Sequence, residues 1–238
     1  MNHRQRYRET IRFGPPDRIP FSPGGPREST LAAWYQQGLP AGTDWQVTLH
    51  EILDIPIHRD FWVGKELFDL ELSPIFEEKV LEHREGHYVV QDWMGAIVEI
   101  SDDYDLSYLR SARDFVTRKW HNFPVSTPED WQEKIVWRYD AQEPARIAEN
   151  FFERVKTAQE EDQIVTMVIK GPFWQLREWC GMEPLCILMA EQPVFVQEMI
   201  DFWRDFVDQM LDRMLPHVQP DSIMVSEDMA YKAHSMIS

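Results

Sequence analysis

Two adjacent carboxylates and a nearby lysine form the group of residues in this sequence that is best suited to chemistry. Glu227 and Asp228 directly follow the apolar run 223–225, and Lys232 comes shortly after them. Two neighbouring carboxylates can push one pKa upward, and a nearby ammonium group counters that shift. Such a group suits acid–base catalysis or the binding of a polar substrate. A solvated loop with a surface ion pair is the alternative that these residues leave open.

The elements that would position these side chains are buried strands that end in turns. Residues 164–169 have the sequence IVTMVI, which is apolar on both faces, as expected for a parallel strand covered by helices. A Gly-Pro pair ends this strand, and residues 173–179 continue with helical spacing. Residues 221–225 predict a second buried strand. Because ligands bind at the carboxyl ends of parallel strands, the two carboxylates are expected at a functional edge.

The rest of the sequence predicts mostly helices, over residues 2–13, 28–37, 45–53, 74–83, 144–159 and 193–214, with one more after the cap residue Thr127. Tyr7 and Ile11 are expected on one face of the first helix. In the last helix, apolar residues recur at three- and four-residue steps, which is typical of core packing. Residues 18–21 predict a short strand, and residues 88–100 predict an antiparallel hairpin that turns at Met94 and Gly95.

The composition and net charge of the chain argue for some classes of protein and partner and against others. The chain has 238 residues, 43% of them hydrophobic, which is enough for a substantial core. Its formal net charge of −17 argues against nucleic acid and anionic membrane surfaces as partners. No run of about 18 apolar residues is present, so no membrane span is predicted. The polar start of the chain and only two cysteines favour a cytoplasmic protein without a signal peptide.

Four segments, in order, resemble the uroporphyrinogen decarboxylase superfamily: RQRYRETIRFGPPDRIPF, FPVSTPEDWQEKI, GPFWQLREWCGMEPLCILMAEQPVFVQEMID and DSIMVSEDMAYKAHSMIS. The resemblance implies an α/β fold, a (β/α)8 TIM barrel with N-terminal helices and an inserted β-hairpin. Such a barrel takes roughly 250 residues as a minimum, and few barrel strands are evident here. The expectation is therefore one incomplete barrel domain over residues 1–238, lacking the C-terminal third of the fold.

The resemblance also implies candidate site residues. Glu51 stands where the family has a catalytic aspartate, and Trp179 stands where it has an active-site tyrosine. Phe173 and Trp174, at the start of the helix after the Gly-Pro turn, are candidate substrate-binding residues, as is Arg27. Arg27 is the one arginine that matches the family's arginine-rich loop. Since a substrate with many carboxylates needs several cations, this departure disfavours decarboxylation.

The favoured interpretation is an enzyme of the methyltransferase-like branch, in which methyl transfer is linked to a corrinoid (cobalamin) protein or cofactor. The resemblance implies that the zinc ligands of that branch, a His-x-Cys and a distant Cys, lie in the C-terminal part of the fold that is expected to be absent, so no metal ligand is assigned to this chain and a zinc site is left open. Decarboxylation of a tetrapyrrole in porphyrin biosynthesis is the alternative. A third interpretation is a non-catalytic domain that binds a corrinoid protein or a small ligand. The cofactor and the oligomeric state are left open.

Overall fold

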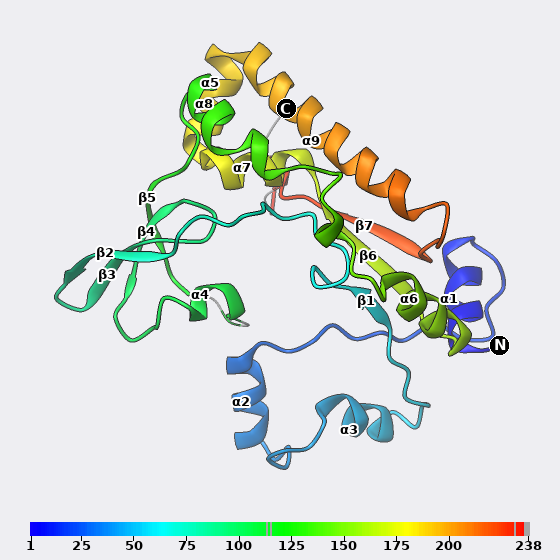
Figure 1. The fold of residues 1–238 in the computed structure, drawn as a ribbon. Helices are drawn as coiled ribbons and strands as arrows, with labels where there is room; N and C mark the ends of the chain where they lie inside the picture. The colour runs from blue at the N-terminus through cyan, green and yellow to red at the C-terminus, as the bar shows by residue number, and fades with distance from the viewer. Residues whose placement is uncertain (113, 115, 231, 236–238) are drawn as a thin grey trace.

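The structure is a computed structural model that describes residues 1–112, 114, 116–230 and 232–235. It is a mixed α/β fold with two separate sheets, one of three parallel strands and one of four antiparallel strands (Figure 1). The α/β class predicted from the sequence is confirmed. No helix in the described part of the chain is both long enough and apolar enough to cross a membrane.

The parallel sheet consists of three strands in the spatial order β1 (Phe61–Val63), β6 (Val165–Lys170) and β7 (Ser222–Ser226). In β6, Val165, Met167 and Ile169 point to one face and are 1%, 1% and 6% exposed. This alternation follows from the period of two in a strand, which turns every second side chain toward the helices. The strands predicted at 164–169 and 221–225 are both confirmed, as is their parallel arrangement.

The main core is built by the helices that follow and precede β6: α6 (Phe151–Glu160), α7 (Pro172–Cys180), α8 (Met182–Glu191) and α9 (Pro193–Met214). The predicted apolar stripe of α9 is confirmed, since Met199, Trp203 and Met210 are all buried. The indole Nε1 of Trp203 donates a hydrogen bond of 2.9 Å to the carbonyl oxygen of Lys170. The end of β6 is therefore fixed against the middle of α9, which runs diagonally across the molecule (Figure 1).

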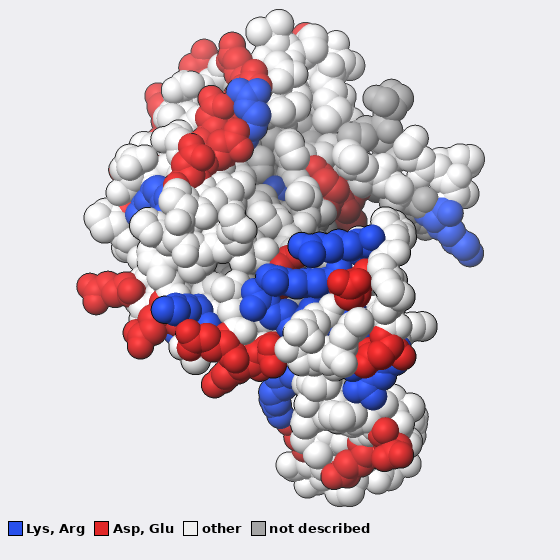
Figure 2. All heavy atoms as spheres, turned by 90° about the vertical axis from the view of Figure 1, so that its right-hand side faces the viewer, with Lys and Arg blue, Asp and Glu red and all other residues white. Residues whose placement is uncertain are grey.

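Helix α1 (His3–Ile11) closes the amino-terminal edge of the parallel sheet with ion pairs. Arg4 and Arg8 both donate to the fully buried carboxylate of Asp221, at 2.9 Å and 2.6 Å. The predicted apolar face with Tyr7 and Ile11 is wrong, because the residues that α1 buries are His3 and Arg6. Polar pairing holds this helix in place of apolar packing. Figure 2, drawn from the α1 side, shows basic side chains gathered in a band on this face.

Helices α2 (Glu28–Gln36) and α3 (Trp45–Ile52) form an arm that stands apart from both sheets (Figure 1). Both helices were predicted. Helix α2 buries none of its residues, and α3 buries only His50. The strand predicted at 18–21 is wrong, because this segment pairs with no strand among the described residues and runs as an irregular connection between α1 and the arm.

The antiparallel sheet lies between β1 and β6 in sequence and consists of β2 (Lys79–Arg84), β3 (His87–Gln91), β4 (Ile97–Ser101) and β5 (Lys119–Asn122), with the short helix α4 (Tyr108–Ser111) between β4 and β5. The predicted inserted hairpin is confirmed, with β3 and β4 antiparallel and a turn at Asp92–Ala96. The helix predicted at 74–83 is wrong, because residues from Lys79 onward pair with β3 as an edge strand. Strand pairing overrides the local helix signals here.

Helix α5 (Pro128–Lys134) begins as predicted, with the Thr127 hydroxyl accepting from the N–H of Asp130 at 3.2 Å. Two short 3-10 helices follow it, η1 (Val136–Arg138) and η2 (Pro144–Arg146). The continuous helix predicted at 144–159 is wrong in its first part. Ile147 forms an isolated bridge with Phe68, so the regular helix α6 starts only at Phe151.

One face of the parallel sheet is uncovered, and this predicts self-association. Trp62, Val168 and Met224 share that face and are 52%, 38% and 43% exposed, and β7 has no strand on its outer side among the described residues. The burial predicted for residues 221–225 is therefore wrong. Apolar sheet faces and open edges promote association. We expect the protein to bind a hydrophobic dye and to elute from a sizing column above 28.3 kDa.

The substitution Met224→Lys is expected to lower both the dye fluorescence and the apparent mass, because it places a charge on the uncovered face. Val194→Lys is the matched control, since Val194 is also apolar and 73% exposed but lies on α9. Equal effects of the two substitutions, or a wild-type monomer that binds no dye, would contradict the prediction.

Candidate functional site

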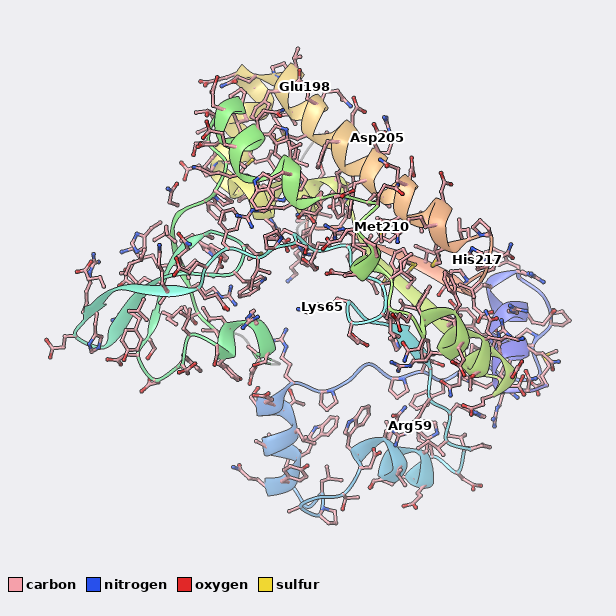
Figure 3. The ribbon with its side chains drawn as sticks, in the orientation of Figure 1. Arg59, Lys65, Glu198, Asp205, Met210 and His217 are labelled. Atoms are coloured by element: carbon pink, nitrogen blue, oxygen red, sulfur yellow. The ribbon has the colours of Figure 1, made fainter. Side chains whose placement is uncertain are left out.

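A pocket of about 1190 Å³ lies at the carboxyl edge of the parallel sheet. One wall is formed by the segments that follow β1 and β6, including Lys65, Lys170 and Trp174. The opposite wall is formed by the hairpin turn at Trp93 and by β5. Lys65 extends from the loop after β1 into the opening between the two sheets (Figure 3). The location agrees with the rule that ligands bind at the carboxyl ends of parallel strands.

Lys170, the last residue of β6, is the centre of a charged cluster in this pocket. Its Nζ lies 2.9 Å from Oε2 of Glu71 and 2.7 Å from Oε2 of Glu178. Burial alone would lower the pKa of Lys170, but the two carboxylates outweigh burial and raise that pKa above its ordinary value. The lysine therefore stays an ammonium group, and its role is to hold charge and not to accept a proton.

Helix α7 positions the second carboxylate of this cluster. Trp174 and Glu178 are four residues apart, so they share one face of the helix. The indole Nε1 of Trp174 donates to Oε1 of Glu178 at 2.9 Å, and the other oxygen of Glu178 is left for Lys170. Trp174 thus forms part of the pocket wall and also fixes the orientation of Glu178.

Glu227 lies at the predicted edge, but its carboxylate holds the start of α7. Its two oxygens accept hydrogen bonds of 2.9 Å from the backbone N–H groups of Phe173 and Trp174. These N–H groups belong to the first turn of a helix, where no carbonyl group of the helix is available to accept from them. The amino-terminal end of a helix also attracts negative charge. A Cβ atom at Gly171 would overlap the Glu227 side chain, so glycine is required for this close approach. The structure therefore gives Glu227 a positioning role.

Gly171→Ala is expected to destabilise the protein by about 1–3 kcal/mol, because Glu227 must move and α7 loses its cap. The midpoint of urea denaturation measures this change. Gly24→Ala is the matched control, since a Cβ at Gly24 would meet nothing within 4 Å. Equal midpoints for Gly171→Ala and the wild type would show that Glu227 is not held against this glycine.

The structure does not bring the other predicted catalytic residues together. Asp228 is 51% exposed and pairs with Arg177 at 2.9 Å. Lys232 is exposed and forms no ion pair with Glu227 or Asp228 among the described residues. Glu51 is exposed on α3 in the arm, outside the pocket lining.

The predicted substrate-binding residues are divided between the pocket, the core and the arm. Of these residues, Trp174 lines the pocket. Phe173 and Trp179 are buried in the core at 4% and 1% exposure, and the indole Nε1 of Trp179 donates to the Tyr139 hydroxyl at 3.2 Å. Arg27 is exposed at the start of α2 and does not line the pocket.

Asp69 is a pocket residue that the sequence did not single out. It is half-buried, and one of its carboxylate oxygens accepts from the N–H of Glu71 at 2.8 Å. Burial raises the pKa of Asp69 above its ordinary value, and the hydrogen bond from Glu71 opposes that rise only in part. A carboxylate with a raised pKa in a ligand pocket is suited to general acid–base catalysis. The acidic run after the short strand β1 was the one available signal.

Together these residues offer a fixed ammonium group, a half-buried carboxylate with a raised pKa and aromatic walls. Within the described residues, no three His, Cys, Asp or Glu side chains are arranged to hold a metal ion. The chain matches no model of a known protein family, and no curated protein or solved structure matches it either.

Proposed function

We propose that this chain is an enzyme of the uroporphyrinogen decarboxylase type of barrel, and that it transfers a methyl group with a corrinoid as partner or substrate. The observation that carries the proposal is the large pocket with balanced charge at the carboxyl edge of the parallel sheet. The hairpin inserted between β1 and β6 and the uncovered sheet face also support a barrel of this kind, because inward-facing side chains of a barrel pack against other strands.

Charge balance favours methyl transfer over tetrapyrrole decarboxylation. The pocket lining includes five basic residues, which are Lys65, Arg110, Arg118, Lys170 and Arg177, and five acidic ones, which are Glu66, Asp69, Glu71, Glu178 and Glu183. Four of the basic residues already have carboxylate partners within 4.0 Å. A substrate with many carboxylates would find few cations to bind it. A corrinoid ring, whose side chains are mostly neutral amides, suits such a lining better.

The aromatic side chains of the pocket fit a broad flat ring, since Trp93, Trp120, Phe123 and Trp174 all line it. A bound corrinoid would supply the methyl-carrying centre. The protein would hold a small co-substrate beside the corrinoid. Polar groups of that co-substrate would contact Lys170 and its two carboxylate partners, Glu71 and Glu178. If the methyl acceptor is a thiol, the Asp69 carboxylate would take the thiol proton, and the corrinoid would give up the methyl group to the sulfur and keep the electron pair of the bond that held it.

Methylcobalamin with dithiothreitol as the methyl acceptor tests the proposal. We expect methylcobalamin to quench tryptophan fluorescence to saturation and its visible spectrum to change faster with the protein than without it. Trp174→Ala is expected to weaken binding. Trp137→Ala is the matched control, because Trp137 is 53% exposed and lies outside the pocket. Binding without faster methyl loss would favour a non-catalytic binding domain, and conversion of uroporphyrinogen to coproporphyrinogen would favour the decarboxylase.

A further inference from the structure

Arg118 has few partners for its charge in the hairpin wall of the pocket. Its side chain is 17% exposed, and its Nη1 lies 4.0 Å from Oδ2 of Asp92, which is too far for a hydrogen bond. Its one hydrogen bond to a described residue is long, 3.4 Å from Nη2 to the carbonyl oxygen of Leu109. A guanidinium group has five N–H donors, so most of those of Arg118 have no acceptor in the described part of the chain.

Two indole rings hold this guanidinium in place. Its Cζ lies 5.7 Å from the ring centroid of Trp93 and 5.7 Å from that of Trp120. Arginine stacks readily on aromatic faces, and stacking leaves the N–H groups at the edge of its plane free to donate. Burial lowers the pKa of Arg118 below its ordinary value, and Asp92 compensates only in part. The group is thus oriented in advance but incompletely paired.

Asp92 accounts for this incomplete pairing. The Asp92 side chain is fully buried, and its Oδ1 accepts hydrogen bonds of 3.0 Å from the N–H groups of Met94 and Ala96. Its Oδ2 is buried and has no hydrogen-bond partner. Asp92 therefore attracts the guanidinium through charge without occupying its donors. The other three basic pocket residues with carboxylate partners, Arg110, Lys170 and Arg177, are in direct contact with those partners.

We propose that Arg118 binds a single carboxylate group of the substrate. The planar fork of a guanidinium matches a carboxylate through two parallel N–H···O bonds. The inference rests on the proposed function only in taking this pocket as the substrate site. It adds the class of co-substrate, which is a small molecule with one carboxylate. That carboxylate lies at the hairpin wall, and the reacting end of the molecule points toward Lys170 and Asp69 across the pocket.

Benzoate is the probe, because it combines one carboxylate with a flat ring that can contact the pocket tryptophans. Benzamide, which has a similar shape and no charge, is the matched ligand. Isothermal titration is expected to show benzoate binding to the wild type at least tenfold more tightly than benzamide. Arg118→Gln should remove that preference, and Arg118→Lys should restore only part of it. Arg204→Gln, on the exposed face of α9, is the control and should leave it unchanged.

Asp92→Asn gives a second test in the opposite direction. It removes the negative charge that attracts Arg118 in opposition to a ligand carboxylate, so benzoate should bind severalfold more tightly, and this test holds even if Arg118→Gln fails to fold. The inference is overturned if Arg118→Gln folds and keeps the preference for benzoate over benzamide, or if Asp92→Asn weakens benzoate binding. It is also overturned if Lys65→Met alone removes that preference. Benzoate binding that depends on Arg118, without any binding of methylcobalamin, would sustain this inference and reject the proposed function.

Discussion

Asp69→Asn is expected to slow methyl transfer from methylcobalamin to dithiothreitol by about 100-fold or more, the usual contribution of a positioned general base. The asparagine keeps an oxygen that can accept from the N–H of Glu71, which Asp69 bonds at 2.8 Å, so the fold should be retained. What is lost is the acceptor of the thiol proton. Glu198→Gln is the matched control, because Glu198 is exposed on α9 (Figure 3) and does not line the pocket.

The pH dependence separates catalysis by Asp69 from a structural role. Burial raises the pKa of Asp69, and a general base must be ionised to act. The wild-type rate should therefore fall, as the pH is lowered, at a pH above the ordinary range for an aspartate. In Asp69→Asn the residual rate should lose this acid limb. A variant that keeps the acid limb, or that loses activity together with its cooperative unfolding, would show that Asp69 is not the base.

The fold could be predicted where the pattern was long and regular. Strand β6, the Gly-Pro turn after it and helix α9 were predicted closely, because their apolar periodicity extends over many residues. Strand β1 was missed because it has only three residues, Phe61–Val63, and owes its position to pairing with β6. Because β1 was not predicted, the loop that carries Asp69 and Glu71 into the pocket was not recognised as following the carboxyl end of a strand.

The candidate site could be predicted in location but not in detail. Glu227 does lie at the carboxyl edge, yet both of its oxygens serve the N–H groups at the start of α7. This pairing depends on the approach of β7 to α7 in space, which no sequence spacing reveals. Trp174 and Trp179 are five residues apart, so their side chains lie on different faces of α7. Trp174 shares its face of α7 with Glu178 and lines the pocket, whereas Trp179 turns to the core.

Asp92→Asn is expected to stabilise the protein at neutral pH by about 3 kcal/mol, which is large for a single substitution. Burial, opposed in part by the N–H groups of Ala96 and Met94 and by Arg118, raises the pKa of Asp92 from 3.8 to about 6. Ionisation therefore costs about 3 kcal/mol more in the folded protein than in the unfolded chain. Because this pKa already includes the attraction to Arg118, the same figure is the expected gain when asparagine removes the charge.

The sign of the pH dependence follows from the raised pKa. Between pH 3.8 and about 6, the folded state binds more protons at Asp92 than the unfolded state does, so this residue contributes less stability as the pH rises. The free energy of unfolding by urea, measured at pH 4 and pH 7, should therefore show a larger advantage of Asp92→Asn at pH 7. Asp208→Asn, an exposed carboxylate on α9, is the control and should change stability by less than about 0.5 kcal/mol.

A stabilised Asp92→Asn variant would also explain what the aspartate does. A buried charge that costs about 3 kcal/mol does not add to stability at neutral pH, and we expect its effect to lie in its attraction to Arg118. Asp92 lies 4.0 Å from Arg118, so its charge attracts the guanidinium that contacts Trp93 and Trp120 while leaving its donors free, and removal of that charge lets the guanidinium shift toward a ligand. Near-UV circular dichroism of these indoles should therefore change in Asp92→Asn even as stability rises. An unchanged spectrum, or a variant less stable than the wild type at pH 7, would mean that the pair is an ordinary buried ion pair.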